Sequence, residues 1–253
     1  MGEIKDKEKV AELCGAIIGD GWIQADERCF FLAGDSREDK DYYDNHISKI
    51  ISNFIYPVKP KEFPYWQVYG VSLYKKEAIN KLLRLGLPKG RKAESASVPN
   101  WILTSNKKII RAFIRGFFDT DGGIFCQKDY TKYATKFNSK YHTKLRLRMS
   151  SISEKLINQI HELLIKLDFR CVKRTIKRGF RNNRNNRDIH LIEINSLDNL
   201  RRFFEEISPS NLRHTSKYLI WKKFGFCPPN TTIIQRKDIL KNQSSPYNLY
   251  KQE

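Results

Sequence analysis

The sequence has few cysteines and few histidines, and neither type is arranged to hold a metal ion or a disulfide framework. The five cysteines are odd in number and scattered, and no pair has the close spacing of a zinc site or a redox motif. The five histidines are also scattered, without the i, i+4 pair of a metal-binding helix. These absences argue against zinc chemistry and indicate a reducing, intracellular compartment.

Long apolar runs and a surplus of acidic residues are absent as well. No apolar run approaches the roughly 18 residues needed to cross a membrane, and the polar N-terminus does not resemble a signal peptide, so we expect no membrane partner. The chain has 47 Lys and Arg against 28 Asp and Glu, a formal net charge of +19. Its aromatic content is that of a folded protein, so this charge predicts a polyanionic partner for a folded body and not a disordered tail.

Two stretches about a hundred residues apart share one pattern, in which an apolar helix ends in an acid followed by a glycine. Residues 13–21 read LCGAIIGDG, and residues 114–122 read IRGFFDTDG. Apolar residues recur at helical spacing before each acid. We expect Asp6 and Ser105 to be the N-caps of the two helices, Gly21 to end the first helix in the left-handed conformation, and Gly122 to stop the second.

Small residues occupy matched positions in the two predicted helices. Gly15 and Gly19 lie four residues apart in the first helix, and Gly116 and Thr120 take the same places in the second. A glycine inside a helix costs roughly 1 kcal/mol relative to alanine. The pattern therefore predicts that the two helices pack backbone to backbone along these faces.

That packing would bring the acids Asp20 and Asp121 together. Each would lie at a helix C-terminus, where the helix dipole already presents negative charge. Two carboxylates placed there repel each other, and a hard divalent cation such as Mg²⁺ would relieve the repulsion. The alternative is that each acid is a solvated cap residue. The matched glycines and matched context favour the metal site.

The two stretches resemble the paired motifs of the LAGLIDADG homing endonucleases. The residues that carry the resemblance are Leu13, Gly15, Ile17, Asp20 and Gly21 in the first copy and Gly116, Asp119, Asp121 and Gly122 in the second. Two-motif members of this family fold as pseudo-dimers from one chain, and this chain is similar to that kind, particularly the intron-encoded enzymes of archaeal ribosomal RNA genes. The resemblance extends to about Phe226 and implies a monomeric, cytoplasmic protein from an archaeal source.

The rest of the chain repeats a helix-strand-strand-helix-strand-strand-helix unit. The predicted strands are residues 22–25, 29–33, 65–71, 123–127, 143–150, 169–176 and 189–194, and the predicted helices outside the motifs are residues 43–54, 79–83, 153–164, 197–207 and 216–224. We expect an α+β fold with two four-stranded antiparallel, saddle-like sheets joined at the motif helices. The expected divisions are an N-terminal half (1–93), a linker (94–106), a C-terminal half (107–226) and a tail (227–253) that forms an extra helix or an arm.

Basic residues gather on one face of the predicted second sheet. Lys144, Arg146 and Arg148 alternate with apolar residues, so period two places them together on the face away from the core. The alternative is an ordinary solvent-exposed strand with no binding role, although three like charges in register favour a phosphate-facing sheet.

A basic turn lies in the same half of the chain. Its cations are Lys173, Arg174, Lys177, Arg178, Arg181, Arg184 and Arg187, with Asn182, Asn183, Asn185 and Asn186 interleaved. Arginine pairs with guanine and asparagine with adenine in the major groove, which a two-stranded ribbon fits. The alternative is a flexible loop that is attracted only to phosphate, and we expect some of each.

The resemblance also implies a chemistry, namely the metal-dependent hydrolysis of one phosphodiester in each DNA strand. Asp20 and Asp121 would bind divalent ions that polarise the scissile phosphates and activate water. The backbone carbonyls of Gly19 and Thr120 are further candidate ligands. Mg²⁺ is the expected ion, with Mn²⁺ substituting for it and Ca²⁺ binding without supporting cleavage.

Other positions match family residues around the metals less regularly. Asp35 and Ser151, at the ends of the second strand of each half, stand where family members carry glutamine or another polar group. Lys92, in a basic loop, and Arg213, before the closing helix, match the basic residues near the scissile phosphates. Simple phosphate binding is the alternative for both. Arg37 is a weaker candidate for DNA contact.

Three functions compete. The first is a site-specific double-strand DNA endonuclease. The second is a maturase that binds intron RNA, since a basic sheet does not choose between duplexes. The third is a catalytically inactive DNA-binding protein, against which the retention of Asp20 and Asp121 argues. Magnesium-dependent nicking separates the first from the others.

Overall fold

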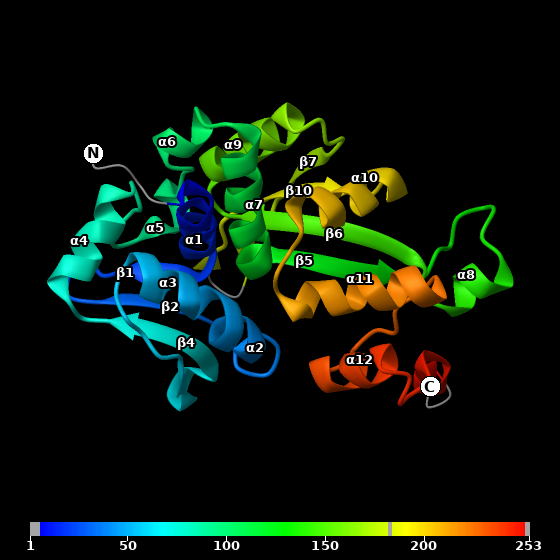
Figure 1. Cartoon of the computed structure of the whole chain (residues 1–253). Helices are drawn as coiled ribbons and strands as arrows, with labels where there is room; N and C mark the ends of the chain where they lie inside the picture. Colours follow the sequence, from blue (N-terminus) through cyan, green and yellow to red (C-terminus); the bar gives the residue numbers. More distant parts are fainter. Residues whose placement is uncertain (1–5, 182–183, 251–253) are drawn as a thin grey trace.

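The two motif helices lie side by side at the centre of the molecule, with one half of the chain on each side of them (Figure 1). The computed structural model describes residues 6–181 and 184–250. The central helices are α1 (Lys7–Asp20) and α7 (Lys107–Asp121). Their pairing confirms the arrangement that the matched small residues predict.

Each half contains a four-stranded antiparallel sheet, which confirms the α+β fold. The N-terminal sheet has the order β1 (Gly21–Ile23), β2 (Phe30–Asp35), β4 (Val68–Leu73), β3 (Lys61–Phe63). The C-terminal sheet has the order β5 (Gly122–Gln127), β6 (Lys144–Ser151), β10 (Ile189–Ile194), β7 (Val172–Ile176). A two-stranded ribbon, β8 (Phe180–Arg181) and β9 (Arg184–Asn185), lies between β7 and β10 in the chain.

The remaining helices are distributed over both halves of the chain. In the first half and the segment after it they are α2 (Lys40–Tyr42), η1 (Tyr43–Ile47), α3 (Ser48–Phe54), η2 (Pro64–Trp66), α4 (Lys76–Arg84), α5 (Lys92–Ser95) and α6 (Asn100–Leu103). In the second half and tail they are α8 (Lys136–Lys140), α9 (Glu154–Lys166), α10 (Leu197–Arg202), η3 (Phe203–Ile207), α11 (Leu212–Phe224), α12 (Ile233–Leu240) and η4 (Pro246–Tyr250). The π-helical turns η1 and η3 divide the helices expected over residues 43–54 and 197–207. No described helix is long and apolar enough to cross a membrane.

The predicted N-cap residue is correct for the first motif helix and wrong for the second. Asp6 is the N-cap of α1, and its carboxylate accepts a hydrogen bond from the backbone N–H of Lys9 at 3.2 Å. The N-cap of α7 is Asn106 and not Ser105. The reason is local, because Asn106 directly precedes the first helical residue and is itself a strong capping residue.

Gly21 does not adopt the expected left-handed conformation, although Gly21 and Gly122 each directly follow the end of their helix. Gly21 and Gly122 have φ of −82° and −87° and are extended, because each one begins a strand directly after its helix. Glycine is needed there for space. A Cβ at Gly21 would lie 2.7 Å from the carbonyl oxygen of Ile17, and one at Gly122 would overlap Phe118.

The central helices touch through their backbones. A Cβ at Gly15 would overlap the carbonyl oxygen of Phe113, and one at Gly116 would overlap the carbonyl oxygen of Glu12. Backbone atoms cannot move aside as a flexible side chain can, so only glycine allows this approach. The close contact fixes where the two helices end relative to each other.

Candidate active site

The two motif acids reach neighbouring positions because their helices end together. A Cβ at Gly19 would overlap the Thr120 hydroxyl and would lie 3.4 Å from the backbone nitrogen of Asp121. Asp20 and Asp121 are the last residues of α1 and α7. The structure therefore brings together the two carboxylates that the sequence pairs.

Burial and mutual repulsion act on these carboxylates. Burial first and the nearby Asp121 charge second raise the pKa of Asp20 to about 7, against the opposing effects of Arg213 and Lys92. Burial also raises the pKa of Asp121, against the opposing effects of Lys92 and Arg213. Two carboxylates that resist ionisation at a shared site are a setting in which a bound cation would favour the charged forms.

Lys92 caps the C-terminus of the first motif helix. Its Nζ donates to the carbonyl oxygens of Ile17 and Ile18, at 2.8 Å each, and to that of Gly19 at 2.5 Å. Burial lowers the pKa of Lys92 to about 8. The residue begins the short helix α5 and is not part of an open loop.

Arg213 takes the same role on the second motif helix. Its Nη2 donates to the carbonyl oxygen of Thr120 at 2.6 Å, and its Nη1 lies 3.1 Å from Oδ2 of Asp39. Helix α11 begins at Leu212, four residues before its expected start, because the side chain of Asn211 caps it. Arg213 therefore lies in the first turn of α11 and not ahead of it. Each motif helix thus ends against one buried or half-buried cation.

A buried polar network around Asp119 holds Arg213 in place. The Asp119 carboxylate accepts hydrogen bonds from the backbone N–H groups of Ser210 at 2.9 Å and Asn211 at 3.1 Å. The Asn211 side chain donates to Asp39 at 2.8 Å and to the Asp119 carbonyl at 3.0 Å. Asp119 therefore anchors the start of α11. The sequence gives no signal for Asp39 or Asn211, which meet only through the fold.

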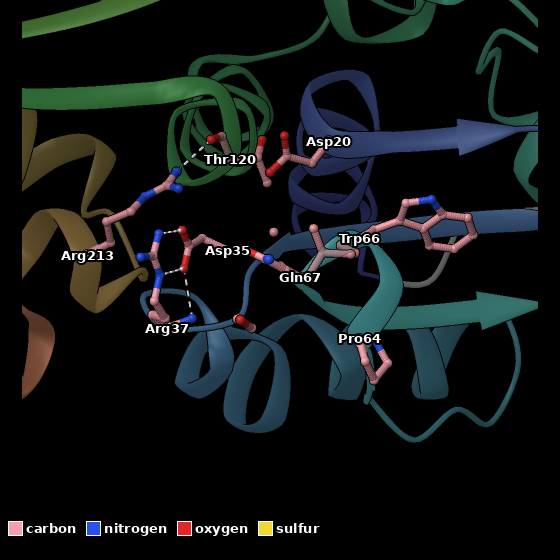
Figure 2. A pocket seen from close by; sticks show the side chains of 12 residues that line it. Asp20, Asp35, Arg37, Pro64, Trp66, Gln67, Thr120 and Arg213 are labelled. Carbon is pink, nitrogen blue, oxygen red and sulfur yellow. Dashed lines mark hydrogen bonds and ion pairs between the residues drawn. The ribbon is translucent and has the colours of Figure 1, made fainter.

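A cavity of about 700 Å³ opens beside Asp20 (Figure 2). It is lined by Asp20, Ala33, Gly34, Asp35, Ser36, Arg37, Pro64, Trp66, Gln67, Val68, Thr120 and Arg213. Asp35 thus shares the cavity with Asp20. Arg37 pairs with Asp35, with Nη2 and Oδ2 2.8 Å apart, and this hydrogen-bonded pair lowers the pKa of Asp35.

Ser151 does not occupy the place in its half that Asp35 occupies. Gly21 pairs with Leu32, and Gly122 pairs with Met149. Asp35 lies three residues after Leu32, whereas Ser151 lies only two residues after Met149. The two side chains are therefore on opposite faces of their sheets. The Ser151 hydroxyl accepts a hydrogen bond from the backbone of Ser153 at 3.1 Å, and Ser151 does not line the cavity.

The donor set at the acids fits a magnesium-type ion and not a zinc-type ion. The described residues contain no group of three or more His, Cys, Asp or Glu side chains that could hold a metal. Mg²⁺ needs only one or two carboxylates, because it keeps waters and takes substrate phosphate oxygens. The carbonyls of Gly19 and Thr120 point to the same place but already accept hydrogen bonds from Lys92 and Arg213.

The exposed face of the C-terminal sheet carries the expected basic row. Lys144, Arg146 and Arg148 alternate with buried apolar residues along β6. Arg148 donates to the buried carboxylate of Glu193 at 2.6 Å, and the Nε of Arg174 lies 3.6 Å from the same carboxylate. Glu193, which the sequence analysis does not single out, thus holds two arginines on this face.

The remaining residues of the predicted DNA-binding set are dispersed. Lys173 lies on the opposite, helix-covered face, where its Nζ donates to Asn158 of α9 at 2.6 Å. Lys177 pairs with Asp188 at 2.5 Å, the backbone N–H of Arg178 also donates to Asp188, and Arg187 is exposed. Arg181 and Arg184 belong to the β8–β9 ribbon, but their side chains and the residues Asn182 and Asn183 lie outside the described structure.

Comparisons with known proteins agree with this fold. Residues 108–208 match the model of the LAGLIDADG-like domain. The replication factor C small subunit of Methanocaldococcus jannaschii is 27% identical over 214 residues, which cover 84% of this chain. Since the match covers only 10% of that relative, the chain spans about a tenth of its length.

Solved structures show the same architecture at low sequence identity. I-DmoI in complex with DNA and Mn has a TM-score of 0.51 at 17% identity, covering 81% of this chain and 98% of that chain. The N-terminal LAGLIDADG domain of DUF199/WhiA has a TM-score of 0.51 at 12% identity, covering 83% and 86%. Residues 108–208 thus match a LAGLIDADG-like domain model, and the chain shares its fold with the homing endonuclease I-DmoI and with WhiA.

Proposed function

We propose that this chain is a monomeric, site-specific endonuclease that cuts both strands of a DNA duplex with the help of divalent metal ions. The observation that carries the proposal is the pair Asp20 and Asp121, at the ends of two helices packed backbone to backbone between two sheets. A basic sheet face beside this pair supplies charge for a polyanion. I-DmoI, which has the same fold, has been crystallised with DNA in the presence of Ca, Mn or Mg.

The acidic and basic residues of the site would have different roles. Asp20 and Asp121 would hold the ions, which when bound would polarise a phosphate and lower the pKa of a water. Lys92 and Arg213 place positive charge at the two helix ends, where it stabilises negative charge on a phosphate in transfer. Lys92 can also hold or release a proton near neutral pH, because its pKa is about 8.

Cleavage of a randomised duplex library with Mg²⁺ tests this function. Wild type should make double-strand cuts at one sequence. Asp20→Asn and Asp121→Asn should still bind that sequence but cut it on the order of a hundredfold more slowly, as when a preorganised charge-stabilising group is lost. The exposed Asp26→Asn is the matched control and should cut normally.

An inactive DNA-binding protein is the second candidate. Lys92 and Arg213 already bond the Gly19 and Thr120 carbonyls, the further oxygens that an ion could use. The same fold also occurs in WhiA. If wild type binds one duplex tightly but cuts it with none of Mg²⁺, Mn²⁺ or Ca²⁺, the endonuclease proposal fails and this candidate stands.

A further inference from the structure

The two sheets present different chemistry at equivalent positions. Strand pairing sets the equivalence, since Gly21 lies opposite Leu32 in one half and Gly122 opposite Met149 in the other. One residue before those partners, on the face away from the core, stand Phe31 in β2 and Arg148 in β6. Phe31 is opposite Ser72, whereas Arg148 is opposite Glu193. An aromatic ring thus replaces an ion pair at the same point of the surface.

The N-terminal sheet carries an aromatic patch on this face, formed by Trp22, Phe31, Phe63 and Trp66. Trp22 and Phe31 are paired across β1 and β2. The ring centroids of Phe31 and Phe63 are 4.6 Å apart, and those of Phe31 and Trp66 are 5.8 Å apart. Trp22 is 43% exposed and Trp66 is 62% exposed, so the patch faces solvent. Strand alternation places only Asp35 and Lys61 as charged residues on this face of β1 to β4.

The aromatic patch is continuous with the candidate active site. Trp66 and Val68 line the same cavity as Asp20, Thr120 and Arg213, and Figure 2 shows Trp66 at one side of that cavity. Trp66 belongs to η2, the turn that joins β3 to β4. In the C-terminal half the corresponding connection, between β7 and β10, is the basic ribbon β8–β9. Because Trp66 lines the cavity at Asp20, we expect a duplex bound at the acids to lie beside this patch.

We propose that the N-terminal sheet is a specificity surface that contacts the C5-methyl groups of thymines in one half-site, while the C-terminal sheet binds phosphates and guanines in the other. The inference rests on the proposed binding of duplex DNA. Thymine presents a methyl group in the major groove that takes apolar contacts, and phenylalanine is among the side chains that make them. A face with one cation can make few contacts with phosphates. It would therefore recognise DNA through apolar contacts with bases.

Replacing thymine by deoxyuridine tests the proposal, because it removes the methyl group and keeps the base pair. The duplex selected by the wild-type protein is made in two forms, each with deoxyuridine in one half-site only, and equilibrium binding is measured at two salt concentrations. We expect one form to bind about fourfold more weakly per contacted methyl group, the effect of losing one buried methyl-sized group. This loss should not change with salt, unlike contacts made by cations.

A pair of variants assigns the sensitive half-site. Phe31→Ser should remove the deoxyuridine effect, and Arg148→Ser, at the equivalent position, should leave that effect intact while reducing the salt dependence of binding. Equal binding of both deoxyuridine forms and natural duplex by the wild-type protein overturns the inference, with no variant needed. Binding without cleavage overturns the endonuclease proposal and leaves this inference standing. Failure to bind any duplex overturns both.

Discussion

At the scale of single residues, Lys92 and Arg213 stand at equivalent places, each bonded to the final carbonyls of one motif helix. Because pseudo-twofold symmetry relates them, each should serve a different DNA strand. We expect Lys92→Met to slow cutting of one strand on the order of a hundredfold and Arg213→Met to slow the other by a similar factor. Duplexes labelled on either strand, assayed for nicked intermediates, measure this.

The control for these variants is Arg37→Met, which removes an exposed cation from the cavity that Arg213 also lines. It should weaken binding without favouring either strand. If Lys92→Met and Arg213→Met both slow the same strand, the pairing of one cation with one strand is wrong.

His214 should make the fold sensitive to mild acid. It is fully buried beside Arg213, and burial together with the nearby cations holds its pKa well below the usual 6.5. The unfolded chain therefore binds a proton near pH 6.5 that the folded chain does not. The contribution of neutral His214 to the free energy of unfolding is fully present above pH 6.5. It is lost as the pH falls from there toward the lowered pKa, by up to about 1.4 kcal/mol per pH unit.

Urea midpoints measured from pH 7.5 to 5.5 check this expectation. His214→Phe is the matched variant, because the ring packs against Phe118 with centroids 4.6 Å apart and phenylalanine keeps that contact without titrating. Its stability should vary less with pH over this range. Equal slopes for wild type and variant would show that other groups control the acid sensitivity.

At the scale of elements, the central helix pair should respond to alanine in an unusual way. An alanine in place of a helical glycine commonly gains about 1 kcal/mol. Here Gly116→Ala should cost at least about 3 kcal/mol, because its Cβ meets the fixed carbonyl of Glu12. Gly19→Ala meets mainly the Thr120 hydroxyl, so Thr120→Ala should restore most of its loss.

A double-mutant cycle of unfolding free energies makes the comparison. Thr120→Ala combined with Gly116→Ala is the control pair and should show no rescue. Rescue of both glycine variants by Thr120→Ala would mean that the interface relaxes generally, against the backbone contact described.

The sequence predicts these elements well where periodicity and matched small residues are strong, and less well where partners come from elsewhere in the chain. Helices α1 and α7 and strand β10 follow from their patterns alone. The sequence does not predict strand β3, because its Lys-Glu-Phe segment follows prolines and gains its order from pairing with β4. The sequence predicts too late a start for α11, since the cap Asn211 depends on a buried contact with Asp119, 92 residues away in the chain.

The candidate site shows the same division. Asp20 and Asp121 could be paired from the sequence because their motifs repeat. Asp39, Asn211 and Glu193 could not be found, because a lone polar residue in a sequence does not reveal that the fold will bury it beside a cation. Ser151 resembles Asp35 in the sequence because both stand at a strand end, although the strand register places the two on opposite faces.

At the scale of the whole molecule, the tail fastens the two halves together. Helix α12 follows the C-terminal half and packs on α11 (Figure 1). Its Arg236 is only 1% exposed and donates to Ser216 of α11 at 2.9 Å and to Glu38 of the N-terminal half. The tail is therefore a structural link between halves that otherwise meet mainly along α1 and α7.

Arg236→Met should consequently weaken the whole fold and not only the tail. Loss of this guanidinium leaves Glu38 and Ser216 without their partner, and we expect a cost of about 3 kcal/mol, the lower end for breaking a buried pair because Glu38 is 23% exposed. Lys237→Met is the control. Its ammonium lies 3.8 Å from Asp41 with both side chains over 40% exposed, so it should cost less than about 1 kcal/mol. Hydrogen exchange of α1 and α7 should quicken in the first variant alone, and protection there that stays unchanged would confine the tail's influence to α11.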